Sequence, residues 1–291
     1  MIKRAVVVGG AGAVGRLFTE RLLDSGARVT VVDTAEPEPG DGRAARLRGD
    51  VTAVDFRLAA ELGHADLVVL AVPEPVALKA IHGVAAEMRP DALLVDTLSV
   101  KGSVARAVRA EAPGVQAVGL NPMFAPSLGF EGRPVAAVVI NAGSRTEELL
   151  ALVESWGARI VRVDEQRHDR LAAASQALVH AAVLSFGIAL AGMDVPGEDL
   201  RAAAPPPANT LLALLARIAS GTPEVYWDVQ HGNPEAAPAR KALADAVRRL
   251  ADTVEHGTEA DFADLLGELR THLGDDLAHH RDTCAALFAR I

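Results

Sequence analysis

The first half of the chain alternates short apolar runs with segments of helical periodicity. Apolar runs bounded by glycine, proline or polar residues are typical of buried strands, and strands that alternate with helices indicate a parallel, doubly wound α/β sheet of the Rossmann type. The predicted strands are Ala5–Val8, Val29–Val32, Leu67–Val72, Leu93–Val95, Val135–Ile140 and Ala158–Val163, and the helices between them include Val14–Leu23, Val76–Met88 and Ser103–Ala110.

From residue 165 onward the strand signal ends and the pattern becomes helical. Leu171–Met193 is long, apolar and rich in alanine, and its length would suffice to cross a membrane. Gln176, His180 and Ser185 interrupt the run and no cationic flank follows it, so we expect a helix buried between packed neighbours and shared across a homodimer.

The change of pattern predicts two domains. Residues 1–164 form a dinucleotide-binding domain, and residues 165–291 form an all-helical substrate and dimerisation domain. After a proline-rich break at residues 204–209, amphipathic periodicity predicts the helices Thr210–Ile218, Ala236–Glu255 and Ala260–Leu273.

Composition narrows the classes of partner. The chain has 291 residues, 50% of them hydrophobic, and a formal net charge of −9, which argues against nucleic acid or a membrane surface as a partner and leaves a small molecule. One cysteine, Cys284, excludes an internal disulfide and a cysteine metal cluster and fits a reducing cytoplasm. We expect no metal site and no secretion signal, since the apolar start runs into glycines instead of a cleavage site.

A glycine-rich turn follows the first predicted strand. In "VVVGGAGAVGR" at 6–16, Gly10 permits a tight turn, Gly12 lets the backbone approach a pyrophosphate, and Gly15 lets helix and strand pack closely. Ala13 and Val14 open the helix whose N-terminus would receive the phosphates. Alone, this pattern also fits a glycine-rich loop without a ligand.

Asp33, at the end of the second predicted strand, strengthens the dinucleotide interpretation because its carboxylate can accept hydrogen bonds from the adenosine ribose. No arginine stands among Thr34, Ala35, Glu36 and Pro37, so NAD is favoured over NADP, although Arg43 or Arg46 could fold back to bind a 2′-phosphate. Val72 and Pro73, at the end of the predicted strand Leu67–Val72, are expected to lie beneath the ribose and nicotinamide.

Two further strand ends and one helix carry a family resemblance. "LLVDTLSVKGS" at 93–103, "AVGLNPMFAPSLG" at 117–129 and "HDRLAAASQALVHAAVLSFG" at 168–187 resemble the prephenate dehydrogenase family, and the likeness extends to "YWDVQHGNP" at 226–234. The resemblance implies a dinucleotide-binding domain, a helical dimerisation domain and the NAD(P)-dependent oxidative decarboxylation of a cyclohexadienyl substrate. Three motifs in the right order are more specific than a dinucleotide fold alone.

The resemblance also implies roles for individual residues. Ser99 matches a serine that supports the catalytic histidine, Lys101 a lysine beside the substrate, His180 a helix histidine facing the pocket, and Arg217 an arginine that pairs with a substrate carboxylate. Gln176, one turn from His180, joins the predicted substrate site. From the residues alone, His180 could equally be a core histidine bonded to Gln176 or to a helix carbonyl. Arg217 could be a surface arginine. If the Arg217 guanidinium is instead buried on the apolar helix "LLALLARIAS" at 211–220, it needs an anion as its partner.

Three other polar positions have simpler interpretations. His168 and Asp169 are expected to cap a helix and steer local charge. Asn209 stands where some relatives carry an arginine, and this implies that one cationic contact has been lost. His279 and His280 are expected on a solvated face.

Asn121 departs from the family pattern. Where the family has His-Pro-Met-Phe-Gly-Pro, this chain has "NPMFAP" at 121–126, and the missing histidine is the family's general base. An amide is not basic at neutral pH, and a lost general base typically lowers the rate by roughly a hundred- to ten-thousand-fold.

A substrate with an amine in place of the ring hydroxyl would not need that base. Hydride loss beside a neutral amine leaves a stable iminium, so we expect the 4-amino analogue of prephenate as substrate, with Asn121 orienting the amine. The alternatives are a prephenate or arogenate dehydrogenase that uses another base, and a non-catalytic NAD-binding regulator. An unrelated β-hydroxyacid or imine dehydrogenase would leave the "DTLSVKG" and "NPMF" pair unexplained.

Overall fold

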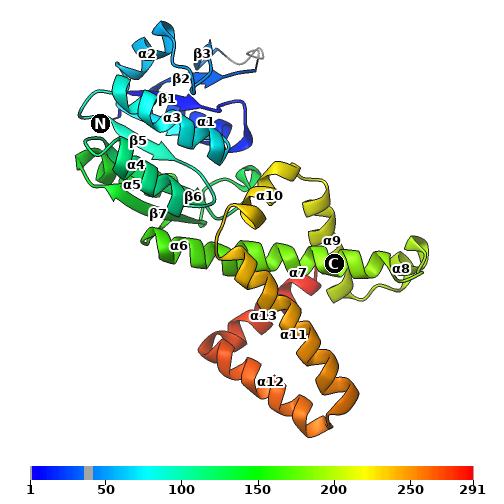
Figure 1. The fold of residues 1–291 in the computed structure, drawn as a ribbon. Helices are drawn as coiled ribbons and strands as arrows, with labels where there is room; N and C mark the ends of the chain where they lie inside the picture. The colour runs from blue at the N-terminus through cyan, green and yellow to red at the C-terminus, as the bar shows by residue number, and fades with distance from the viewer. Residues whose placement is uncertain (1, 36–41, 291) are drawn as a thin grey trace. The chain divides into compact units, whose positions relative to one another are not determined.

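The computed structural model describes residues 2–35 and 42–290, which lie in two compact units, Met1–Leu171 and Ala172–Ile291 (Figure 1). The division falls inside the helix that begins at Glu165, whereas the sequence prediction placed it just before that helix. The first turns of this helix carry His168 and Asp169, whose side chains are buried. These turns therefore belong to the first unit.

The first unit is built on one mostly parallel eight-stranded sheet with the strand order β3-β2-β1-β4-β5-β6-β7-β8, which confirms the predicted fold class. The order reverses between β1 and β4, the point at which open sheets of this type bind ligands. The strands are β1 Arg4–Val8, β2 Arg28–Asp33, β3 Ala45–Arg48, β4 Leu67–Leu70, β5 Leu93–Asp96, β6 Gln116–Pro122, β7 Pro134–Asn141 and β8 Arg159–Arg162.

The pairing of β6 with β7 is antiparallel, so the sheet is mixed and not wholly parallel as predicted. The connection between these strands contains only the short 3₁₀ helix η1, Pro126–Leu128. A parallel crossover needs a dozen or more residues and usually a helix, so this short connection reverses the chain direction. β8 then pairs with β7 in parallel.

Helices cover both faces of the sheet because successive residues of each strand point to opposite faces. Val7 and Val31 pack with α1 and α5, whereas Val6, Val8 and Leu70 pack with α2, α3 and α4. The helices are α1 Ala13–Asp24, α2 Phe56–Leu62, α3 Glu74–Glu87, α4 Gly102–Glu111, α5 Ser144–Ser155 and α6 Glu165–Ala172.

The second unit is helical throughout its described residues, as predicted. The helix that starts with α6 continues through a π-helical turn, Ala173–Ala177, into α7, Leu178–Ala191, and by length and composition alone this 27-residue helix could cross a membrane. α7 packs against α9 and α11. The remaining elements are α8 Gly197–Ala203, α9 Pro206–Ala219, α10 Pro223–His231, α11 Ala236–His256, α12 Glu259–Leu273, η3 Gly274–Asp276 and α13 Leu277–Phe288.

Asp66 ties several elements of the first unit together. Its carboxylate accepts hydrogen bonds from the backbone N–H groups of Lys3 at 2.7 Å and Arg4 at 3.0 Å, and ion pairs from Arg89 at 2.7 Å and Arg145 at 3.2 Å. Burial raises the pKa of Asp66, but these bonds outweigh it, so the pKa lies below its ordinary value. The ionised carboxylate therefore stabilises the folded state.

We predict that Asp66→Asn lowers the free energy of unfolding near neutral pH by about 1–3 kcal/mol, because the two guanidinium groups lose their charged partner. A carboxylate with a depressed folded pKa stabilises the fold above its unfolded pKa of about 3.9, and this contribution disappears as the pH falls through the folded pKa. Urea unfolding at several pH values measures the difference in the free energy of unfolding between wild type and variant, which should shrink below about pH 4.

The matched control is Asp24→Asn, which removes the exposed pair with Arg43 and should change the free energy of unfolding by less than about 1 kcal/mol. Equal losses for both variants at every pH would contradict the prediction.

Candidate active site

The glycines after β1 shape a cradle for a phosphate group. A Cβ on Gly10 would lie 2.4 Å from a methyl carbon of Val31, and one on Gly15 would lie 2.3 Å from the carbonyl oxygen of Gly9, so both positions require glycine. A Cβ on Gly12 would meet only Gly9, at 3.3 Å, so the other side of Gly12 is open. Gly9, which the sequence analysis did not single out, has a φ of +78° that favours glycine. The turn therefore fits the expected pyrophosphate.

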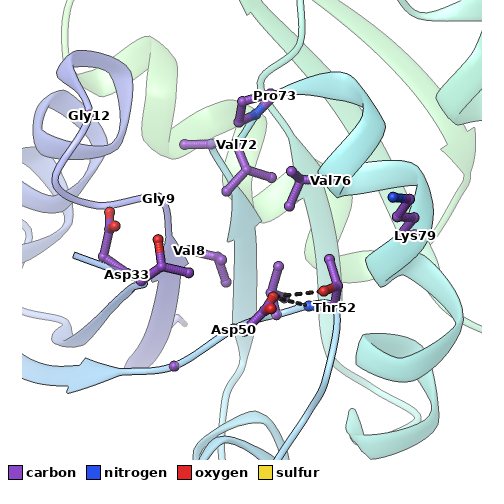
Figure 2. A pocket seen from close by; sticks show the side chains of 14 residues that line it. Val8, Gly9, Gly12, Asp33, Asp50, Thr52, Val72, Pro73, Val76 and Lys79 are labelled. Atoms are coloured by element: carbon purple, nitrogen blue, oxygen red, sulfur yellow. Dashed lines mark hydrogen bonds between the residues drawn. The ribbon is translucent and has the colours of Figure 1, made fainter.

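A cavity of about 560 Å³ lies beside this turn (Figure 2). Four predicted cofactor residues, Gly12, Asp33, Val72 and Pro73, line it. Gly10 and Gly15 shape the turn without lining the cavity, and Ala13 and Val14 begin α1 but do not line the cavity either. The other lining residues are Val8, Gly9, Thr34, Gly49, Asp50, Val51, Thr52, Ala71, Val76 and Lys79.

Asp33 is held in place by the loops around it. One carboxylate oxygen accepts a hydrogen bond from the Ala11 N–H and the other from the Ala35 N–H, both at 3.1 Å. An ionised carboxylate can accept about four hydrogen bonds, so capacity remains for ribose hydroxyls. Glu36 and Pro37 lie outside the described residues.

The two arginines that could have favoured a 2′-phosphate do not line this cavity. Arg43 pairs with Asp24 at 2.6 Å, and Arg46 is exposed on β3. Arg48 lies opposite Asp33 in the pairing of β3 with β2, and its Nε donates to the Thr34 carbonyl at 3.2 Å.

Asp50 and Thr52 add a polar wall that the sequence analysis missed. The Asp50 carboxylate accepts hydrogen bonds from the Thr52 hydroxyl at 2.8 Å and the Thr52 N–H at 2.9 Å, and these bonds lower the pKa of Asp50 (Figure 2). Such an Asp-x-Thr turn is common in loops, so its sequence gives no signal for a ligand.

Lys101 differs from its predicted place beside the substrate. Its side chain is fully buried, and the ammonium pairs with Asp96 and donates to the Leu120 carbonyl at 3.0 Å. Burial lowers the pKa of Lys101, and the charge of Asp96 opposes this shift. Gly119 leaves room for the pair, because a Cβ there would lie 2.8 Å from both side chains. Lys101 therefore braces β5 against β6 and presents no charge to a ligand in this structure.

Asn121 lies at the carboxyl end of β6, is 3% exposed, and has a partner that the sequence did not reveal. Its Nδ2 lies 3.1 Å from Nε2 of His168, which is 1% exposed. Nδ1 of His168 lies 2.8 Å from the Asp169 carboxylate. A histidine thus stands next to the position where the family's histidine is missing.

Asp169 anchors this group. Its carboxylate accepts the N–H groups of Lys101 at 2.8 Å and Gly102 at 2.9 Å and so caps α4, in agreement with the predicted capping role. Burial raises the pKa of Asp169, but the bonds from His168, Lys101 and Gly102 outweigh it, so the pKa lies below its ordinary value. Ser99 is half-buried and makes no hydrogen bond with the residues that the structure describes.

In the helical unit, the predicted substrate residues His180 and Arg217 lie near each other. Burial lowers the pKa of His180, and the charge of Arg217 lowers it further, so the imidazole is neutral at pH 7. Its ring contacts that of Tyr226 edge-on, with centroids 5.1 Å apart, and its Nδ1 has no hydrogen-bond partner among the described residues.

Arg217 is exposed in the last turn of α9, which agrees with the surface alternative for this residue and not with a buried guanidinium. Its position near the helix end keeps the long side chain in solvent. Asn209 donates to the Ala204 carbonyl at 3.2 Å, within the turn that begins α9. His279 and His280 are exposed, as predicted.

The π-helical turn places Gln176 and explains a contact from α10. A π turn displaces carbonyls from the α-helical hydrogen-bond pattern, and Gln230 donates to the Ala177 carbonyl at 2.7 Å. Arg240 in turn donates to Gln230 at 2.6 and 2.9 Å. Gln230 lies in "YWDVQHGNP", so this motif supports the helix that carries Gln176 and His180.

Comparisons with known proteins agree with this geometry. A sequence profile described as "Prephenate dehydrogenase, nucleotide-binding domain" matches residues 20–162. The chain is 53% identical to a Streptomyces pristinaespiralis protein named 4-amino-4-deoxyprephenate dehydrogenase, over 99% of this chain and 97% of that protein. It is 26% identical to a "Probable arogenate/prephenate dehydrogenase" of Methanocaldococcus jannaschii, over 93% of this chain and 61% of that longer protein.

The fold agrees as well. The crystal structure of prephenate dehydrogenase from A. aeolicus, in complex with hydroxyphenyl propionate and NAD+, matches 94% of this chain and 97% of that chain with a TM-score of 0.75 at 19% identity. Both the high identity over the whole length and the profile match assign the same enzyme class. The chain belongs to the prephenate dehydrogenase family of oxidoreductases.

Proposed function

We propose that the protein catalyses the NAD-dependent oxidative decarboxylation of 4-amino-4-deoxyprephenate to 4-aminophenylpyruvate. The observation that carries the proposal is Asn121, a non-basic residue at the strand end where the family pattern has a basic histidine. The relative of 53% identity that is named for this activity supports the same substrate.

The chemistry balances without a base at position 121. The free amine is the reacting form. Hydride leaves the ring carbon that bears the amine and passes to the cofactor. The nitrogen lone pair then forms a C=N bond to this carbon, which gives an iminium. The bond to the ring carboxylate then breaks, its electron pair makes the ring aromatic, and carbon dioxide leaves while nitrogen keeps both hydrogens. A hydroxyl substrate would pass through a strongly acidic protonated ketone, so it requires a proton acceptor at the moment of hydride transfer.

The residues divide the remaining tasks. Asn121 accepts a hydrogen bond from the amine, and Ser99 lies in the loop after β5 at the same edge of the sheet. Arg217 pairs with a substrate carboxylate, while neutral His180 and Gln176 orient the substrate by hydrogen bonds. Lys101 holds β5 and β6 in position through Asp96.

NAD, when bound, accepts the hydride. Asp33 supports NAD because its carboxylate suits free ribose hydroxyls and would repel a 2′-phosphate. Among the described residues that line the cavity, Lys79 is the one with a positively charged side chain. It lies on α3, away from Asp33 in the view of Figure 2, and so is not placed to bind a 2′-phosphate beside Asp33.

A prephenate or arogenate dehydrogenase with another base is the second candidate. His168 is the specific observation in its favour, since this imidazole lies 3.1 Å from Asn121. However, its Nε2 lone pair already accepts a hydrogen bond from Asn121, which makes it unsuited to accept a substrate proton.

We further propose a homodimer formed through the helical unit. Exposed apolar side chains recur at helical spacing along α11 and α12, and Val247 and Val254 of α11 are 60% and 65% exposed in the single chain. Ile188 of α7 is 76% exposed. Large exposed apolar surfaces are typical of protein–protein interfaces. Burial of α7 in such an interface would explain the apolar composition of this helix. A cytoplasmic location remains a prediction that rests on the free thiol of Cys284.

The substrate proposal predicts a switch at position 121. The wild type should oxidise the 4-amino substrate well and prephenate poorly, and Asn121→His should raise kcat/KM for prephenate by up to about a hundredfold by restoring a base. Activity on the amine should stay level or fall. The absorbance of the reduced nicotinamide measures the rate of oxidation of each substrate. The control Asn121→Leu, which supplies neither base nor acceptor, should lower amine oxidation without raising prephenate oxidation. A wild type that prefers prephenate would contradict the proposal, and one that binds NAD but oxidises neither substrate would favour a regulator.

We predict that Arg217→Ala lowers kcat/KM roughly tenfold to a hundredfold, mainly through KM, because a charge-assisted contact with a substrate carboxylate is lost. The dissociation constant for NAD should not change. Arg201→Ala, at the end of the neighbouring helix α8, is the matched control and should behave as wild type. Unchanged kinetics in the Arg217 variant would remove this residue from the substrate site.

Light scattering should report twice the chain mass of 30.3 kDa at micromolar concentration. Val254→Lys should shift the mass toward the monomer, because it places a charge on the apolar face, whereas Asp252→Asn on the same helix should not. A wild type that is monomeric at this concentration would contradict the dimer.

A further inference from the structure

We propose that His168, held by Asp169, is a positioning residue that fixes which end of the Asn121 amide faces the substrate, and that it turns the oxygen toward the substrate. The inference deepens the proposed function and rests on it. It assigns a task to a buried histidine that has no part in the chemistry itself.

The geometry restricts the group to one arrangement. All three side chains are buried, with exposed fractions of 1–4%. Oδ1 of Asp169 accepts hydrogen bonds from the Lys101 N–H and from Nδ1 of His168. Oδ2 of Asp169 accepts a hydrogen bond from the Gly102 N–H. Because the N-terminus of α4 fixes the carboxylate, the carboxylate in turn fixes the imidazole.

The charge of Asp169 then determines which atoms of the group carry protons. An ionised carboxylate can only accept, so Nδ1 of His168 carries the proton. The atom of Asn121 that lies 3.1 Å from Nε2 is the amide nitrogen Nδ2, which can only donate, so Nε2 is the acceptor of this hydrogen bond. The Oδ1 of Asn121 accepts no hydrogen bond from any described residue and is left for the substrate.

The direction of the amide decides whether it helps hydride transfer. The nitrogen lone pair of the substrate must align with the breaking C–H bond and stay free of donors. An amide oxygen binds the substrate N–H and leaves the lone pair free. As positive charge develops on nitrogen, this hydrogen bond becomes charge-assisted and strengthens, so it stabilises the transition state more than the bound substrate. The reversed amide would donate to the lone pair and oppose the reaction.

Two measurements test the inference, and the first needs no substrate. In ¹⁵N-labelled wild-type protein, a ¹⁵N–¹⁵N coupling across the hydrogen bond between Asn121 Nδ2 and His168 Nε2 is expected, because only this orientation puts nitrogen on both sides of the proton. If a full assignment of both side chains shows no such coupling, the proposed orientation is wrong.

The second measurement is a double-mutant cycle with the 4-amino substrate. His168→Phe should lower kcat about tenfold to a hundredfold, through the loss of one oriented, charge-assisted hydrogen bond, with NAD affinity and melting temperature near wild type. The matched control His64→Phe replaces an exposed histidine bonded to a backbone carbonyl and should change nothing.

The rescue distinguishes positioning from packing. In the His168→Phe background, Asn121→Asp should restore much of kcat, because a carboxylate presents an oxygen whichever way it turns. Unchanged kcat in His168→Phe, or a loss that Asn121→Asp does not rescue, would overturn the inference. If the wild type does not oxidise the amine at all, the proposed function fails and the coupling alone decides the orientation. The coupling also decides it if His168→Phe does not fold.

Discussion

The ionised carboxylate of Asp169 is the constraint on which the reactive edge of the sheet depends. It accepts two backbone N–H groups at the start of α4 and the Nδ1–H of His168, so one charge links α6, α4 and, through His168, the end of β6. Removing this charge would leave the helix N-terminus without its cap and the imidazole free to change tautomer. Asn121 can act as a defined acceptor, and not as a turn residue alone, because this chain of contacts gives its amide one direction.

A second buried pair, Lys101 with Asp96, lies at the same edge of the sheet. Breaking such a pair is strongly destabilising because the remaining charge has no water to solvate it. The pair fixes β5 relative to β6, and the loop after β5 carries Ser99. Two contacts of different purpose therefore meet at one sheet edge: the ion pair between Lys101 and Asp96 holds the strands, and the hydrogen bond between Asp169 and His168 orients the reacting groups.

Sequence patterns predicted much of this architecture because short apolar runs and a glycine turn are local signals. They missed β3, whose four residues include two arginines, and they missed the antiparallel direction of β7, although the connection from β6 is too short for a parallel crossover. The replacement at Asn121 was visible, but its partner His168 was not, because the two residues are 47 positions apart and nothing local links them. A capping role for Asp169 could be predicted, but not that it caps α4, whose start lies 68 positions away in the sequence. The sequence left open whether Arg217 is buried or exposed, because helix periodicity does not show how far a long side chain extends from a helix end. The helical unit adds a further limit, because the apolar pattern does not show which side chains of α11 and α12 stay exposed in the single chain.

A competition experiment compares the amine and hydroxyl substrates under identical conditions, because the ratio of products from a mixture equals the ratio of kcat/KM values. Purified protein and NAD are given equal concentrations of prephenate and 4-amino-4-deoxyprephenate, and the two aromatic pyruvates are separated and quantified at low conversion. The account predicts that 4-aminophenylpyruvate exceeds 4-hydroxyphenylpyruvate by at least about a hundredfold, the lower range of what a general base contributes to the oxidation of a hydroxyl substrate. Equal amounts of the two products, or an excess of the hydroxyl product, would contradict it.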